Sequence, residues 1–188
     1  PTPVIGGVGI IKNLKKIASI KLEDNCTIFL IGRTTGHLDL SLFEKVINNS
    51  EIGAPPILNL ECEKLNGEFV RSLIEKYNKE IIGVHDLSDG GLLLGLAEMV
   101  MKNKIGISIE IPKNVKNINN WLFGEDQSRY IIVTKNTKLI ENLGKRNNIF
   151  IRNIGYTGGK NLIVKNCFKI LYKELMDINS KCFSKVFS

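Results

Sequence analysis

The alternation of apolar and polar positions predicts a chain in which short strands and helices follow one another. Four apolar runs bounded by turn residues have the length and β-branched content of buried strands, and a fifth run alternates before Pro112. These predicted strands are residues 26–31, 81–84, 105–111, 131–133 and 149–154. Glycine, asparagine and proline separate the runs, so each strand is expected to end in a turn.

Apolar residues at helical spacing predict the elements between these strands. The clearest helices are residues 60–77 and 91–101, and shorter ones are expected at 41–47, 139–143 and 168–175. Residues 1–12 favour a further strand whose glycines permit close packing, and the chain after Asn179 favours a poorly ordered tail. Because the elements do not follow a strict β-α-β rhythm, the predicted fold class is α+β with α/β/α layers, a mixed β-sheet flanked by helices.

Composition indicates an ordinary globular, cytoplasmic protein. The chain has 188 residues, of which 43% are hydrophobic and 24% charged, which is enough for one domain with a core. Its apolar stretches are too short for a membrane helix, and its four scattered cysteines suggest reduced thiols rather than a zinc site. The net charge of +7 comes from lysines spread along the chain, which favours a solvated surface over a nucleic-acid interface.

The strongest candidate for chemistry is the stretch VHDLSDGGL at residues 84–92, which joins a predicted strand to a predicted helix. The candidate nucleotide-binding residues there are Ser88, Asp89, Gly90 and Gly91. A helix N-terminus attracts phosphate, glycines let a ligand approach the backbone N–H groups, and Asp86 can hold Mg²⁺ against a polyphosphate. The alternative is a plain connection in which Ser88 or Asp89 caps the helix. Residue types alone leave both interpretations open.

A second candidate is WLFGEDQSRY at residues 121–130, just before a predicted strand. Glu125 supplies an acceptor, Gln127 an amide, and Arg129 a planar donor fork suited to phosphate or carboxylate. These three residues form a possible substrate or phosphate pocket. The alternative is a structural Glu–Arg pair at the lip of the strand.

Two glycine-containing turns have weaker signals. Thr34, Thr35 and His37 in GRTTGHL can meet a phosphate, but they more simply end a strand and precede a helix. The segment GYTGG at residues 155–159 is predicted to be a turn. Its Thr-Gly-Gly can bind an anion, but a hairpin turn is the favoured interpretation.

These segments together resemble the phosphoribosylformylglycinamidine synthase family. HDLSDGGLLLGLAEM is similar to its HD-x-SDGG-L signature and LFGEDQSRY to its LFGE-x-QSR(Y/F) segment. PTPVIGGVG, GRTTGHL and GAPP are also similar and occur in the family's order, so the match runs from Pro1 to about Tyr130. The sequence departs from the usual pattern at residues 39–41, where DLS replaces Gly-Gly-Ser or Gly-Gln-Ser.

The resemblance implies a fragment of a longer protein. Residues 1–18 would end an upstream ATP-binding domain, residues 19–180 would form a domain like the C-terminal domain of aminoimidazole ribonucleotide (AIR) synthetase, and residues 181–188 would be a tail. The parent enzyme would be a C–N ligase of de novo purine biosynthesis, converting formylglycinamide ribonucleotide, ATP and glutamine-derived ammonia to formylglycinamidine ribonucleotide. No catalytic residue is expected in this fragment, which would be inactive alone.

The resemblance also implies cofactors and partners. In longer, fused members of the family this turn helps bind an auxiliary ATP or ADP with Mg²⁺. Asp86 would then be the metal ligand and Ser88 a nucleotide contact, with the Gly90 and Gly91 backbone beside the phosphates. The implied partners are the upstream half of the polypeptide, a glutaminase subunit and a small accessory subunit, with neither nucleic acid nor membrane.

Three alternatives remain at this point. The chain can belong to another ATP-using member of the superfamily, such as a thiamine-phosphate kinase or selenophosphate synthetase, although neither normally carries both motifs. It can be a non-catalytic packing domain with a vestigial pocket. A basic module that binds nucleic acid would require clustered lysine and arginine with exposed aromatic residues, which this sequence does not suggest.

Overall fold

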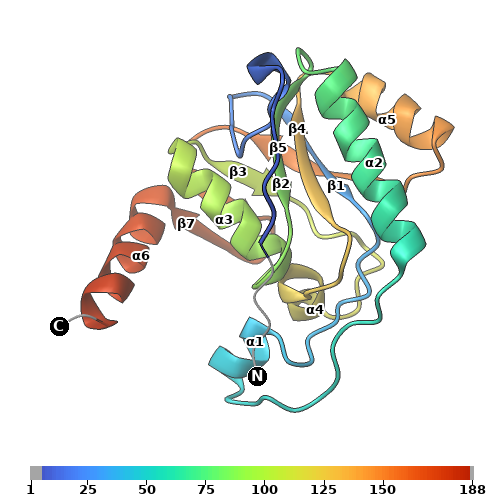
Figure 1. Ribbon diagram of the computed structural model, residues 1–188. Coiled ribbons are helices and arrows are strands. Elements are labelled where there is room, and N and C mark those ends of the chain that lie inside the picture. The colour runs from blue at the N-terminus through green and yellow to red at the C-terminus, as the bar shows by residue number, and fades with distance from the viewer. Residues whose placement is uncertain (1–5, 187–188) are drawn as a thin grey trace.

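A single mixed sheet forms the centre of the molecule. The structure, a computed structural model, describes residues 6–186 (Figure 1). The strands are β1 (Thr27–Ile31), β2 (Ile81–Asp86), β3 (Ile107–Ile109), β4 (Tyr130–Thr134), β5 (Ile151–Thr157), β6 (Asn161–Val164) and β7 (Phe168–Leu171). They lie in the order β2-β4-β1-β5-β3-β6-β7, and every neighbouring pair in this sheet is antiparallel except β3 and β6.

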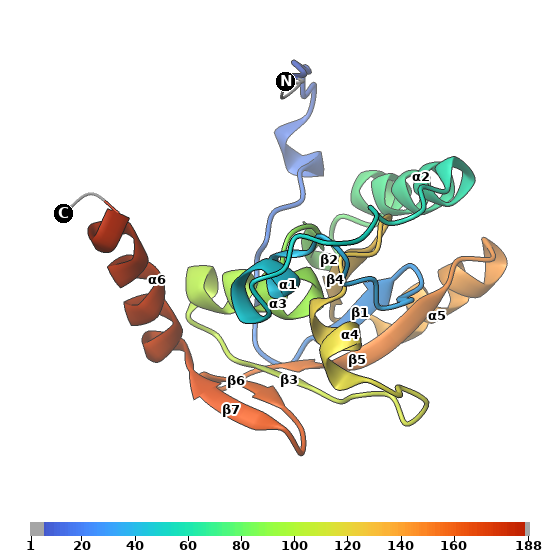
Figure 2. The same ribbon diagram turned by 90° about the horizontal axis from the view of Figure 1, so that it is seen from below.

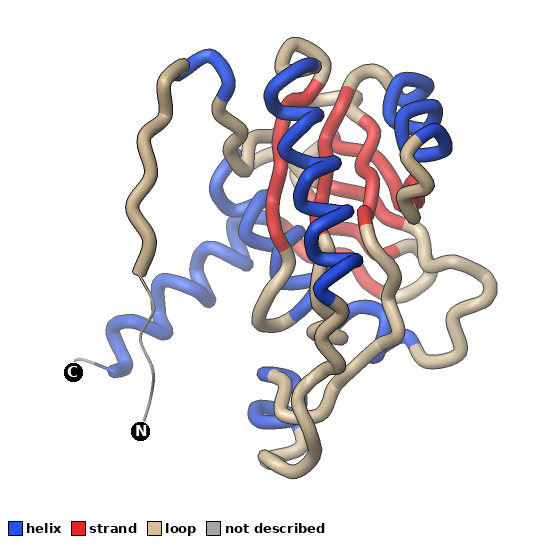
Figure 3. Tube along the Cα trace, turned by 45° about the vertical axis from the view of Figure 1, so that its right-hand side comes forward, coloured by secondary structure: helices blue, strands red, loops and turns tan. Residues whose placement is uncertain are grey.

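Helices cover both faces of this sheet, which confirms the predicted α/β/α layers. The helices are η1 (Leu14–Lys16, a 3-10 turn), α1 (Leu42–Ile47), α2 (Leu60–Lys76), α3 (Gly91–Asn103), α4 (Ile118–Phe123), α5 (Thr137–Arg146) and α6 (Tyr172–Val186). Helices α2 and α5 pack on one face, and α3 and α4 on the other (Figures 2 and 3). None of the helices formed by residues 6–186 combines the length and apolarity needed to cross a bilayer.

The interior strand β1, between β4 and β5, divides the core in two. All five of its residues are buried, and alternate side chains point to opposite faces, as the pleat of a strand requires. Ile28 and Leu30 pack with α3 and α4, whereas Phe29 and Ile31 pack with α2 and α5. A strand that is apolar on both faces is what a sheet covered by helices on both sides needs.

The prediction of a strand at residues 1–12 was wrong for residues 6–12. Residues 6–12 form no strand and are exposed, whereas residues 1–5 of that predicted strand lie outside the described residues. Further along the chain, the carbonyl of Ser19 accepts the N–H of Val84 on β2 at 3.0 Å. The glycine-rich segment therefore finds no strand partner among residues 6–186.

The C-terminal part differs most from the prediction. Strand β3 lies between β5 and β6, so the turn after Thr157 connects two strands that do not pair and is not a hairpin. Gly155 permits this arrangement, because a Cβ at that position would collide with the carbonyl of Ser108 on β3. Residues 155–157 belong to β5 rather than to the turn.

Two predicted helix boundaries also need correction. Phe168–Leu171 is the edge strand β7 rather than part of a helix, because it pairs with β6 over four residues. Helix α6 then continues to Val186, across the expected start of a tail at residues 179–181. Helix α4, only six residues long, was not predicted.

Candidate ligand-binding site

The turn between β2 and α3 has the predicted strand–turn–helix form but a different cap. Strand β2 ends at Asp86, and the N–H of Leu87 still donates to the carbonyl of Arg129 at 3.0 Å. Gly90, in the left-handed conformation with φ 74°, is the N-cap of α3. Neither Ser88 nor Asp89 caps the helix through its side chain, because the left-handed turn places Gly90 at that position.

The two glycines serve contacts within the chain. The N–H of Gly90 donates to Oε1 of Glu125 at 2.7 Å, and the N–H of Gly91 donates to the carbonyl of Ser88 at 3.0 Å. A Cβ on Gly91 would lie 2.5 Å from the carbonyl oxygen of Gly124. The glycine pair therefore lets two loops of this chain approach each other, rather than leaving a cradle of open N–H groups.

Glu125 ties this turn to α1. The same oxygen, Oε1, also accepts the N–H of Leu42 at 2.8 Å, at the start of α1. A single carboxylate thus holds the first turn of one helix and the N-cap of another. Helix α1 begins where predicted, with Ser41 as its N-cap.

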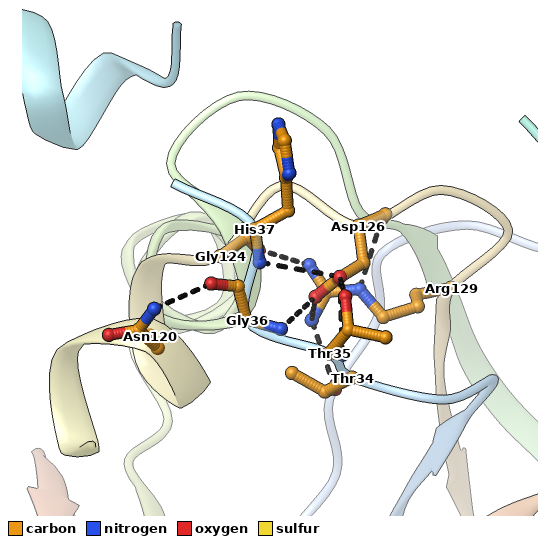
Figure 4. Close-up of polar contacts among 8 residues, drawn as sticks. All are labelled: Thr34, Thr35, Gly36, His37, Asn120, Gly124, Asp126 and Arg129. Carbon is orange, nitrogen blue, oxygen red and sulfur yellow. Dashed lines mark hydrogen bonds and ion pairs between the residues drawn. The ribbon is translucent and has the colours of Figure 1, made fainter. Parts of the chain in front are cut away.

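Asp126 organises the loop that follows β1 (Figure 4). Its carboxylate accepts the N–H groups of Thr35 at 3.1 Å, Gly36 at 3.0 Å and His37 at 3.4 Å, together with the hydroxyl of Thr35. The Asp126 side chain is 8% exposed. Hydrogen bonds to an ionised carboxylate are stronger than those between neutral groups. The loop is therefore bent around an anion that the chain itself supplies.

Arg129 lies beneath this loop and points inward. The residue is 1% exposed and donates to the Asp126 carbonyl at 3.1 Å, to Oγ1 of Thr34 at 3.2 Å and to the Gly124 carbonyl. Burial lowers the pKa of its guanidinium, and the charges of Asp126 and Glu125 oppose that shift. The donor fork of Arg129, which was one candidate for a ligand contact, is used within the loop. An acid–arginine pair, the alternative interpretation, is present, but its acid is Asp126, with the charged atoms 3.9 Å apart, rather than Glu125.

The residues of GRTTGHL have the structural role that we favoured. Thr34 and Thr35 bond to Arg129 and Asp126 as described above. Nε2 of His37 lies 2.9 Å from the carbonyl of Ala54 and so links the loop to the GAPP segment. The backbone N–H groups of residues 35–37 all face one carboxylate, which leaves them unavailable to a phosphate.

Of the remaining candidate residues, Asp86, Ser88, Asp89 and Gln127 are exposed and Glu125 is half-buried. Ser88, Asp89, Glu125 and Gln127 line a hollow of about 270 Å³ between the turn and residues 55–56. Asp86, whose side chain is 79% exposed, has its carboxylate 3.5 Å from Nδ1 of His85. Within the chain from residue 6 to residue 186, no three His, Cys, Asp or Glu side chains come together as a metal site.

Sequence reasoning missed Asp126, whose carboxylate holds the loop after β1. It occupies the variable position of LFGE-x-QSR, so a motif-based interpretation passes over it. A usable signal was its spacing, three residues before an arginine in a segment flanked by apolar runs. A buried arginine needs a nearby acid, and that requirement points to Asp126 as readily as to Glu125.

Comparisons with known proteins agree with the sequence motifs. The family model described as "AIR synthase related protein, C-terminal domain" matches residues 23–165. The "Phosphoribosylformylglycinamidine synthase subunit PurL" of Methylocella silvestris is 44% identical over 180 residues, 93% of this chain and 24% of that protein. The protein of the same name from Bartonella bacilliformis is 37% identical over 98% of this chain and 25% of its own length. The chain thus spans about a quarter of the length of the curated relatives it matches.

Solved structures share the fold at lower identity. "T. maritima PurL complexed with FGAR" superposes with a TM-score of 0.66 at 17% identity, covering 84% of this chain and 29% of that one. A thiamine-monophosphate kinase from Stenotrophomonas maltophilia superposes with a TM-score of 0.51 at 13% identity, covering 79% of this chain and 52% of the kinase. At these identities both show the fold alone. The family match covers most of the chain, which therefore belongs to the AIR synthase related protein family, with residues 23–165 forming the C-terminal domain.

Proposed function

We propose that the chain is the C-terminal part of the synthetase subunit of phosphoribosylformylglycinamidine synthase. The observation that carries this proposal is the extended identity, 37–44% over 93–98% of the chain, to two proteins of that name. The thiamine-monophosphate kinase shares only the fold, at 13% identity. A purely structural domain remains the second candidate, favoured by the use of Glu125 and Arg129 within the chain.

In this proposal the parent enzyme is a cytoplasmic ligase. ATP phosphorylates the amide oxygen of formylglycinamide ribonucleotide, and ammonia then displaces that oxygen as phosphate to form the amidine. The partners would be the upstream half of the polypeptide, a glutaminase subunit that supplies ammonia and a small accessory subunit. A structure titled "Structure of PurLQS from Thermotoga maritima" contains the same fold, with a TM-score of 0.62, which supports assembly with other subunits.

We assign the fragment the role of one wall of a site shared between domains. The proposed division places residues 1–18 with the upstream domain and residues 19–180 in the domain described above. Its support is that residues 6–13 are exposed and that the carbonyl of Ser19 is bonded to Val84 of β2. Active sites commonly lie between domains, so no catalytic residue need lie within this one.

The nucleotide site of the proposal lies at the turn after β2. Asp86 would bind Mg²⁺, Ser88 and Asp89 would contact the nucleotide, and Gly90 and Gly91 would shape the turn beside the phosphates. The donor set fits, because Mg²⁺ in nucleotide sites is commonly held by one or two carboxylates, with phosphate oxygens and water completing the octahedron. The exposure of the Asp86 carboxylate supports this role, since a metal and its phosphates can reach it.

For the possible substrate pocket, Gln127 is the residue we propose to face a ligand. It is exposed and lines both the hollow beside Ser88 and a larger one of about 570 Å³ against α2. Glu125 and Arg129 would act on such a ligand indirectly, by holding the loop that carries Gln127.

The activity itself is testable in the natural-length polypeptide that carries this chain. With formylglycinamide ribonucleotide, ATP, Mg²⁺ and ammonium, it should form the amidine and release one phosphate for each molecule of product. No amidine formation with ammonium would overturn the proposed function, because free ammonia makes the glutaminase unnecessary.

The nucleotide site is tested by calorimetric titration of the same polypeptide with ADP and Mg²⁺. Asp86→Asn and Ser88→Ala should each weaken or abolish one Mg²⁺-dependent binding event. Asp177→Asn, a matched change of an exposed carboxylate on α6, should leave it unchanged. Equal binding by the wild type and both turn variants would show that this turn holds no nucleotide.

A further inference from the structure

A hollow on the other side of the loop after β1 collects positive charge. About 670 Å³ in volume, it lies between residues 33–36, residues 114–117 and the start of β5. Arg33, Lys116 and Arg152 line it, and no carboxylate does. Leu30 and Trp121, both buried in the core, form part of its wall, so the hollow reaches down to the apolar interior.

These three cations are free of ion pairs within residues 6–186. By contrast, Lys21, Lys45, Lys135 and Lys165 each lie within 4 Å of a glutamate. The nearby Glu110 pairs with Lys165 at 3.8 Å, and Asp126 on the far side of the loop is committed to backbone N–H groups and Arg129. Three unneutralised cations around one hollow raise the local potential for an anion.

The two arginines are held in position by an aromatic ring. The guanidinium of Arg33 lies 5.0 Å from the centroid of Phe150, and that of Arg152 lies 5.7 Å from the same centroid. Nη1 of Arg152 also lies 3.4 Å from Oδ1 of Asn114. A guanidinium already stacked loses less rotamer freedom on binding, and its fork of donors matches a phosphate.

We propose that this hollow binds the phosphate group of a small phosphomonoester, with Arg33, Lys116 and Arg152 as its ligands. Phosphate is favoured over a carboxylate because it carries more charge and can accept bonds from three cations at once. Phe150 is already used by the two guanidinium groups, so the site recognises the phosphate rather than stacking a base. This phosphate site is independent of the proposed nucleotide site. Its positive charge comes from side chains of the protein, so phosphate binding here requires no Mg²⁺.

The test is arginine footprinting of the natural-length polypeptide in the presence of EDTA. Phenylglyoxal modifies accessible arginines, and peptide mass spectrometry gives the rate at each one. Ribose 5-phosphate at millimolar concentration should protect Arg33 and Arg152 saturably, whereas Arg146, an exposed arginine on α5 away from the hollow, should react at the same rate throughout. Inorganic phosphate should protect the same pair of arginines.

A lysine variant tests whether the third cation belongs to the site. Lys116→Gln should raise the half-protecting concentration about tenfold, the size expected for one charge-assisted bond, while the exposed Lys102→Gln on α3 should not change it. Asp86→Asn should leave protection intact, which separates this site from the proposed nucleotide site.

Four results would overturn the inference. One is unchanged labelling of Arg33 and Arg152 at saturating phosphate ester, and another is equal protection of Arg146. The third is protection by a single-stranded oligonucleotide but by neither small phosphate, which would assign the hollow to nucleic acid. If Arg33 is unreactive in the polypeptide without ligand, the hollow is covered and the inference also fails.

Discussion

Replacing Asp126 by asparagine should be the most damaging isosteric change in the molecule. The carboxylate accepts three backbone N–H groups and one hydroxyl, and its charge compensates the buried guanidinium of Arg129. Asparagine keeps the volume but removes the charge, and its amide group turns two donors toward the N–H groups of residues 35–37. The loop after β1 would then lose the anion around which it is bent.

The expected cost follows from the burial of both partners. Arg129 is 1% exposed and cannot reach water when its compensating charge is removed. Breaking a buried pair by removing one partner typically costs about 3–5 kcal/mol. With a urea m-value of roughly 2 kcal/mol/M, the unfolding midpoint should fall by about 2 M.

The assay is urea unfolding followed by the fluorescence of Trp121, the single tryptophan of the chain, which is buried in α4. Asp177→Asn serves as the matched control, because that carboxylate is exposed on α6. Arg129→Met and the double variant with Asp126→Asn complete a thermodynamic cycle. If Asp126→Asn shifts the midpoint no more than Asp177→Asn does, or if the cycle shows no coupling, the charge compensation argued here is refuted.

Two further predictions concern backbone strain and pH. Gly91→Ala should destabilise the chain by about 1–3 kcal/mol more than Gly159→Ala, because both have positive φ but only Gly91 would bring its Cβ against another loop. Equal melting temperatures for the two variants would refute this. The pKa of Glu23 is lowered from 4.5 to about 2 by hydrogen bonds from Lys135 and Lys21. Because the folded pKa is depressed, its stabilisation is complete above pH 4.5 and is lost as the pH falls toward 2. Solvent screening limits this stabilisation to under about 1 kcal/mol. Glu23→Gln should therefore lower the urea midpoint slightly at pH 6 and leave it unchanged at pH 2. Salt at 0.5 M should remove the difference at pH 6.

The layered fold could be predicted because local patterns determine it. The apolar run that became β1 and the helical spacing of α2 and α3 indicate their elements without long-range information. The pairing of β3 with β6 could not be predicted, since it joins segments separated by more than fifty residues and inserts a three-residue strand between two others. Strand β7 was mistaken for helix because four residues do not distinguish the two periodicities.

For the candidate site, the sequence predicted the turns better than the contacts of their side chains. The motifs correctly marked the loops that meet at one end of the sheet, and HDLSDGG does join β2 to α3. The sequence could not indicate whether a side chain of these loops points toward a ligand or toward the core. An arginine beside a glycine loop has the same residue type whether it faces a ligand or the core, and only the contacts of Arg129 decide between the two.

The adjacent residues Glu125 and Asp126 explain why this region resembles a ligand site in sequence. Glu125 binds N–H groups at the starts of α1 and α3, and Asp126 binds those of the loop after β1. Glycine-rich turns with free N–H groups are built to accept an anion, and here two carboxylates of the same short segment provide that anion. The three loops are consequently fixed to one another before any ligand arrives. A ligand at the turn after β2 must therefore use groups that the carboxylates leave unbound, such as the exposed side chains of Asp86, Ser88 and Gln127, rather than the backbone of the glycine turn.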